Sequence, residues 1–207
     1  MNACTQPAIE PILAAIGECR KCADQGYPIV LPPLVRYRAV EPQVPAPFVV
    51  IGQAPSLTDL RVRLTYQGPA AQRLMGWLRD AGFADTEIGT RVYMTALTKC
   101  FPGRLPGKST DRAPSQKERG NCRSWLDGEL AILSPRVVIP FGKMAIDTFL
   151  GPAAPLGERI GRRFDKGEVV YIPLPHSSGA STWLNSPGNQ ALLSRAIELI
   201  GAERTRI

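Results

Sequence analysis

Short apolar runs alternate along the chain with segments whose apolar residues recur at helical spacing. Four runs are predicted to be strands: residues 48–52, 91–98, 136–141 and 168–174. Five segments carry apolar residues three and four positions apart and are predicted to be helices: residues 8–17, 69–81, 116–133, 143–150 and 188–201. Strands separated by helices predict one parallel sheet covered on both faces, in a single domain spanning residues 1–207.

Three unusual segments follow predicted strands. They are residues 52–56 (GQAPS), residues 99–103 (KCFPG) and His176 with the serines after it. In open parallel sheets ligands bind outside the carboxyl ends of the strands. We therefore expect these three segments to form one site.

Cysteines are the first candidates for chemistry. The chain has five: Cys4, Cys19, Cys22, Cys100 and Cys122. An odd number without an export signal disfavours disulfides and favours metal binding. Cys19 and Cys22 form a C-x-x-C pair, but Cys100 and Cys122 are 22 positions apart, unlike the second pair of a zinc ribbon. We predict that these four share one cluster, iron–sulfur in preference to zinc, and that Cys4 is a free thiol.

Charge and composition narrow the class of protein. The composition is that of a globular domain, with 44% hydrophobic and 21% charged residues. The net charge of +7 suits a polyanionic partner, although solubility alone would also explain it. No apolar run reaches the roughly 18 residues of a membrane helix, and no secretory signal is recognisable. We expect a cytoplasmic protein with no membrane partner.

The motifs together, in order, resemble the iron–sulfur uracil-DNA glycosylases. They are C-x-x-C, strand–GQAPS, Tyr66-x-Gly68, strand–KC-x-P-G, Cys122, strand–G-x-x-A and strand–PLPHSSGAS. The resemblance implies a three-layer α/β/α sandwich with a central four-stranded parallel sheet. It also implies a 4Fe-4S cluster held by Cys19, Cys22, Cys100 and Cys122.

The resemblance further implies roles at the site. The segment against the sugar and the flipped base comprises Gly52, Gln53, Ala54, Pro55 and Ser56. Tyr66 falls where these enzymes carry an aromatic residue that stacks on the base. The loop that enters the minor groove comprises His176, Ser177, Ser178 and Gly179, with His176, the only histidine, donating a hydrogen bond to the base. Arg104 and Lys108 are candidate phosphate contacts.

Some positions depart from the family pattern. Relatives specialised for uracil carry a carboxylate at the position of Gln53 or Ala54, and many carry an asparagine at the position of Ala96. The position of a wedge leucine is Ala180. Asp59 is the nearest carboxylate that could orient water, although water attacking a cation needs only positioning.

The sequence thus predicts a monomeric DNA glycosylase acting on uracil and on other deaminated bases such as hypoxanthine or xanthine, in DNA. An iron–sulfur DNA-binding protein of the same fold with little turnover is the alternative. An unrelated α/β enzyme acting on free nucleosides would leave the net charge of +7 unexplained.

Overall fold

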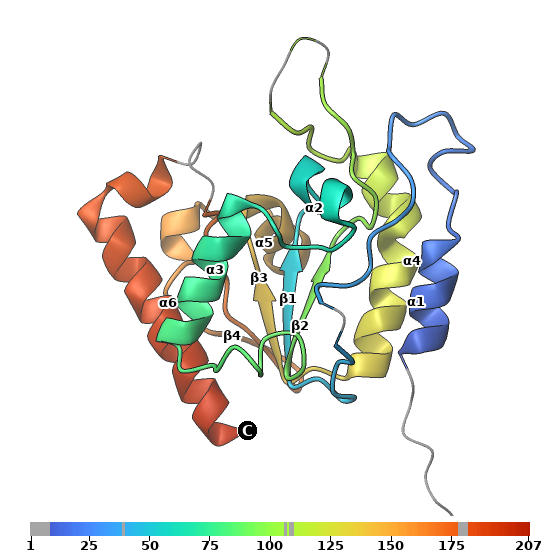
Figure 1. Ribbon diagram of the computed structural model, residues 1–207. Helices are drawn as coiled ribbons and strands as arrows, with labels where there is room; N and C mark the ends of the chain where they lie inside the picture. The colour runs from blue at the N-terminus through green and yellow to red at the C-terminus, as the bar shows by residue number, and fades with distance from the viewer. Residues whose placement is uncertain (1–8, 39, 106, 108–109, 178–181) are drawn as a thin grey trace, which may run out of the picture.

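The computed structural model describes residues 9–207 except 39, 106, 108–109 and 178–181. One sheet lies between two layers of helices (Figure 1), which confirms the predicted three-layer α/β class. The strands are β1 (Phe48–Gly52), β2 (Val92–Ala96), β3 (Val137–Pro140), β4 (Phe164–Lys166) and β5 (Val169–Tyr171). The helices are α1 (Glu10–Gly17), α2 (Leu57–Val62), α3 (Pro69–Asp80), α4 (Gln116–Leu133), α5 (Lys143–Leu150) and α6 (Pro187–Arg206). Within the described ranges, no helix has both the length and the hydropathy needed to cross a bilayer.

The sheet has the strand order β2-β1-β3-β5-β4. Neighbours are parallel except β4, which pairs antiparallel with β5 at the edge. The expectation of four parallel strands therefore needs correction to five, one of them antiparallel. Sequence patterning missed β4 because it is short and its last two residues are exposed, so it has no apolar run.

The last predicted strand, residues 168–174, is longer than the observed β5, which ends at Tyr171. Regular pairing stops there because Pro173 has no N–H to donate. Hydrogen bonds to β3 nevertheless continue beyond it, from Ile172 N to Val138 O and from Leu174 N to Pro140 O. This extension carries the chain to the same edge of the sheet as the ends of β1 and β3.

Both faces of β1 are buried, which explains its continuous apolar sequence. Phe48 and Val50 pack into the core beneath α3 and α6, whereas Val49 and Ile51 pack into the core beneath α1 and α4. Gly52 and Gln53, which continue the same alternation, therefore open toward opposite faces at the end of the strand.

Serine caps set the start of two helices. Ser115 and Glu118 form a capping box at α4, and Ser56 and Asp59 form one at α2. The start of α4 matches the prediction. Helix α2 was not predicted, because six residues are too few to show a helical period.

Candidate functional site

The candidate site lies where the parallel strands end, at the upper edge of the sheet in Figure 1. Gly52 pairs with Ala96 across β1 and β2, and Phe141 pairs with Leu174 just beyond β3. The strand order β2-β1-β3-β5 brings these four strand ends side by side. The predicted segments after β1, β2 and β5 thus reach one edge.

Tyr66 lies directly over the end of β1. Its hydroxyl donates to the carbonyl oxygen of Thr95 at 2.6 Å. A Cβ added to Gly52 would lie 2.6 Å from that hydroxyl, so only glycine admits the ring this close. Tyr66 has a φ of 59°, a left-handed conformation that is uncommon outside glycine. Burial raises the pKa of Tyr66, so the phenol stays protonated.

His176 lies at the neighbouring strand ends. Its ring stacks on Phe141, with centroids 5.2 Å apart and planes 24° apart. A Cβ on Gly142 would lie 3.2 Å from His176 Cδ2, so this glycine too allows a close approach. Burial lowers the pKa of His176 below its ordinary value of 6.5, which makes the imidazole neutral at pH 7.

Asp59 braces the segment after β1. One oxygen, Oδ2, accepts from both the backbone N and the hydroxyl of Ser56, each at 2.7 Å, while Oδ1 accepts from Gln67 N at 2.6 Å. The residue is 5% exposed. Both carboxylate oxygens are therefore committed to holding residues 56 and 67 together, on either side of Tyr66. In the rest of the predicted segment, the backbone carbonyl of Gln53 accepts a hydrogen bond from Thr98 N at 3.3 Å, and Ala54 and Pro55 connect Gln53 to the capping Ser56.

Ser177 faces inward. Its hydroxyl donates to Ala70 O at 2.6 Å, and its carbonyl accepts from Arg73 Nη1 at 3.1 Å. These two bonds fasten the loop after His176 to α3, and sequence patterning did not indicate Arg73. The expected phosphate or base contacts at Ser178, Gly179, Ala180 and Lys108 lie outside the described residues.

A buried ion pair lies beneath the ends of β1 and β2. Lys99 bonds to the carboxylate of Glu129 in α4, and its ammonium also donates to Ala96 O at 2.9 Å. Glu129 accepts from Tyr93 and Thr95 as well. The two charged side chains are 3% and 1% exposed. The pair joins α4 to the strand that carries Ala96 and the carbonyl bonded by Tyr66. The hydrophobic pattern did not predict this ion pair, because lysine and glutamate are expected at exposed positions.

The four predicted cysteine ligands gather from three segments: Cys19 and Cys22 after α1, Cys100 after β2, and Cys122 in α4. Burial, and next the charges of Cys122, Cys19 and Cys22, raise the pKa of Cys100 to about 12, so the thiols are close enough to act on one another. Trp125 Nε1 donates to Cys19 Sγ at 3.2 Å, and Asn121 Nδ2 to Cys22 Sγ at 3.6 Å.

Four cysteine thiols are the donor set both of a structural zinc ion and of an iron–sulfur cluster. No three His, Cys, Asp or Glu side chains of the described chain are grouped as ligands of one metal ion. N–H groups directed at the sulfurs are also typical of such clusters.

Comparison with known proteins finds the same family that the sequence motifs resemble. The model of the uracil DNA glycosylase superfamily matches residues 40–200. A type-4 uracil-DNA glycosylase of Pyrobaculum aerophilum is 28% identical over 159 residues, which are 74% of this chain and 67% of that protein. A type-4 uracil-DNA glycosylase of Thermotoga maritima is 25% identical over 132 residues, which are 63% of this chain and 64% of that protein. A type-4 uracil-DNA glycosylase of Sulfurisphaera tokodaii is 19% identical over 181 residues, which are 84% of this chain and 76% of that protein. Together with the site at the strand ends, these matches show that the chain belongs to the uracil DNA glycosylase superfamily.

Proposed function

We propose that this protein is a monomeric DNA glycosylase that hydrolyses the N-glycosidic bond of uracil, and of other deaminated bases, in DNA. The observation that carries the proposal is that Tyr66 covers Gly52 and His176 lies against Gly142, at the ends of the neighbouring strands β1 and β3. The names of the type-4 relatives support uracil as a substrate.

The reaction develops positive charge on the sugar and negative charge on the departing base. A neutral imidazole can donate a hydrogen bond to the base oxygen on which the charge grows, and it needs no proton from solvent to do so. Tyr66 offers an aromatic face to the extruded base, where stacking contributes about 1–3 kcal/mol per base. His176 thus acts on the leaving group and Tyr66 holds the base.

Water is positioned without a carboxylate base in this scheme. Both oxygens of Asp59 are used within the fold, and neither Gln53 nor Ala54 carries an acid. The amide oxygen of Gln53 can accept a hydrogen bond from water, and an oxocarbenium-like sugar needs only a correctly placed nucleophile. We therefore assign Asp59 a positioning role for the segment between Gly52 and Tyr66.

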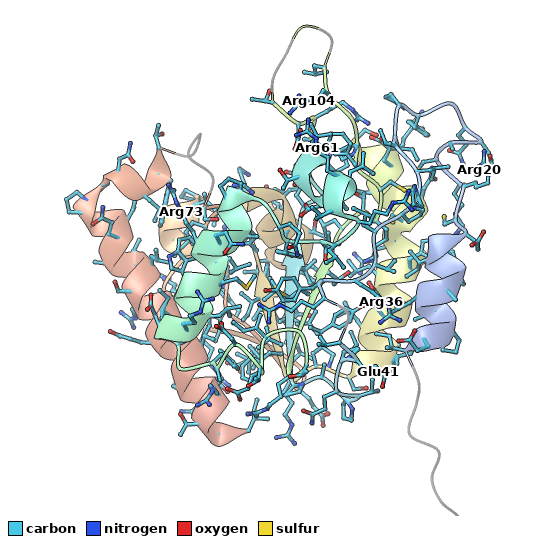
Figure 2. All side chains as sticks on the ribbon, viewed as in Figure 1. Arg20, Arg36, Glu41, Arg61, Arg73 and Arg104 are labelled. Atoms are coloured by element: carbon cyan, nitrogen blue, oxygen red, sulfur yellow. The ribbon has the colours of Figure 1, made fainter. Side chains whose placement is uncertain are left out.

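The small side chain at Ala96 supports breadth of substrate. Ala96 lies at the end of β2 and has no side-chain amide. A wrong base therefore leaves no buried polar group of this residue without a hydrogen bond, and we expect weak discrimination among deaminated bases. Arg61, Arg73 and Arg104, labelled in Figure 2 around the edge where the strands end, supply positive charge for the DNA backbone.

We further propose a 4Fe-4S cluster held by Cys19, Cys22, Cys100 and Cys122. Such a cluster supplies a covalent cross-link between the segment after α1, the loop after β2 and α4. In this proposal His176 and Tyr66 act on the DNA base, and the cluster has a structural role.

The test is base excision from oligonucleotides that each carry one uracil, hypoxanthine or xanthine, followed by alkali and measurement of strand scission. We expect scission at uracil and at least one other base, and a loss of about 10²–10³ in rate for His176→Ala under conditions where circular dichroism shows the variant to be folded. Scission at uracil alone would refute the breadth. Binding of these duplexes without scission would favour the alternative, a DNA-binding protein with little turnover.

A further inference from the structure

A groove runs between α4 and α5, on the opposite side of β1 from Tyr66. Two adjoining hollows of about 500 Å³ and 190 Å³ share Arg119 and Thr148 in their walls. The larger hollow opens beside Gln53 and Lys143, where β1 and β3 end. Gly52 opens to the side of the sheet that Tyr66 covers, whereas Gln53, the next residue, lines the larger hollow, so the groove adjoins the candidate site at the end of β1.

The groove has an uncompensated positive charge. Lys143 is paired with Asp147, and Arg159 Nη1 lies 2.9 Å from Asp147 Oδ1, so the carboxylate in the wall is already neutralised. Arg119 forms neither a side-chain hydrogen bond nor an ion pair within the described part of the chain, and its Nε is buried without an acceptor. A buried N–H without an acceptor is unfavourable, and an anion in the groove would supply the missing acceptor.

The position in the sheet favours a ligand. From β1 the chain crosses first to β2 on one side and then to β3 on the other, so the strand order reverses between β1 and β3. Crevices at such reversal points are the usual ligand sites of open α/β sheets. A guanidinium with free N–H groups matches phosphate oxygens in geometry and charge.

We propose that this groove binds a backbone phosphate of the DNA strand next to the flipped nucleotide, with Arg119 as its ligand. The proposal rests on the proposed function, because it takes DNA as the polyanion. Since Gly52 and Gln53 are consecutive, a strand whose flipped base stacks on Tyr66 at the end of β1 carries a neighbouring phosphate past Gln53 and into the groove.

The experiment measures affinity for a short duplex containing a stable abasic-site analogue over a range of salt concentrations. Each phosphate neutralised contributes about 0.9 to the slope of log K against log salt. Arg119→Ala is expected to lower that slope by about 0.9 and to weaken binding about fivefold at moderate salt. Arg119→Gln, which keeps most of the packing, serves if the alanine variant does not fold and should lower the slope equally.

Arg79→Ala is the matched control. It removes the same charge from α3 near the opposite edge of the sheet, where Arg79 is paired with Asp85 at 2.8 Å, and should leave the slope unchanged. An unchanged slope in both Arg119 variants, or an equal loss in Arg79→Ala, would overturn the proposal. A third outcome would reassign the groove to free phosphate. In that case inorganic phosphate would raise the melting temperature of the wild type but not of Arg119→Ala, and the slope of log K for DNA binding against log salt would be the same in both proteins.

The assay requires no base excision. A protein that shows the expected slopes but never releases a base would contradict the proposed function and keep the phosphate site. The reverse result, excision with no effect of Arg119, would contradict only the phosphate site.

Discussion

At the scale of single residues, the contact between Gly52 and Tyr66 decides the shape of the candidate base pocket. The phenol can cover the end of β1 only because position 52 has no Cβ. Its hydroxyl, bonded to Thr95 O at 2.6 Å, fixes the ring over the end of β1. The pocket wall is therefore set by one missing methyl group and one hydrogen bond.

Gly52→Ala should destabilise the protein and weaken binding of uracil-containing DNA, because its Cβ would overlap the Tyr66 hydroxyl at 2.6 Å. Overpacking of this kind typically costs about 1–3 kcal/mol. Tyr66→Phe removes the nearest atom and leaves ring carbon Cζ at 3.3 Å, so it should restore part of the loss. Urea unfolding of the wild type, both single variants and the double variant measures this coupling. Strictly additive free energies of unfolding would contradict the contact.

At the scale of elements, the loop after β2 is fastened to the first turn of α4 by a charged hydrogen-bond network. Arg112 donates to both oxygens of Glu118, at 2.8 and 2.6 Å, and Ser115 N donates to the same carboxylate at 2.6 Å. Glu118 is 1% exposed. These bonds, chiefly the one from Arg112, lower the pKa of Glu118 from its ordinary 4.5 to about 2.

This network predicts a loss of stability in acid. Because the pKa of Glu118 is lower in the folded chain, the carboxylate stabilises the fold fully above about pH 4.5, and that contribution is lost as the pH falls toward 2. The shift corresponds to about 3 kcal/mol in the free energy of unfolding. Urea titrations of the wild type and Glu118→Gln at pH 7 and pH 3 test this. The difference between the two proteins should fall by more than half between pH 7 and pH 3. Equal differences at the two pH values would exclude the network as the cause.

At the scale of the whole molecule, the two apolar cores on either side of the sheet do not depend on the cysteines. Strand β1 lies in both cores, and neither core includes a cysteine, whereas the four cysteines lie on three other segments: after α1, after β2 and in α4. Loss of a cluster should therefore loosen the segment after α1 and the loop after β2 while the sheet persists.

Cys22→Ser should abolish the iron content and visible colour of the protein and lower its melting temperature by more than about 5 °C, with the far-ultraviolet circular dichroism largely retained. Cys4→Ser is the control and should change neither property, because Cys4 is expected to be a free thiol. A colourless wild-type protein that contains zinc would contradict the iron–sulfur assignment but not the ligand set.

Much of the architecture was predictable from local patterns. Strand β1 and helix α4 begin and end at the predicted residues, since each has a continuous apolar run or a helical stripe with a serine cap. The edge strand β4 and the short α2 were missed because neither shows a period in its own sequence. His176 and Tyr66 were identified through their motifs.

What the sequence determined by itself is the set of elements, the class of fold and the residue types available for chemistry, because these depend on neighbours within a few positions. Only the tertiary structure decided which side chains are already engaged. Asp59 and Ser177 form hydrogen bonds that hold loops in place, Lys99 and Glu129 form a buried pair, and the side chain of Arg119 has no partner among the described residues. The reason is that hydrogen-bond partners come from residues distant in the chain, and only packing of the sheet and helices brings them together.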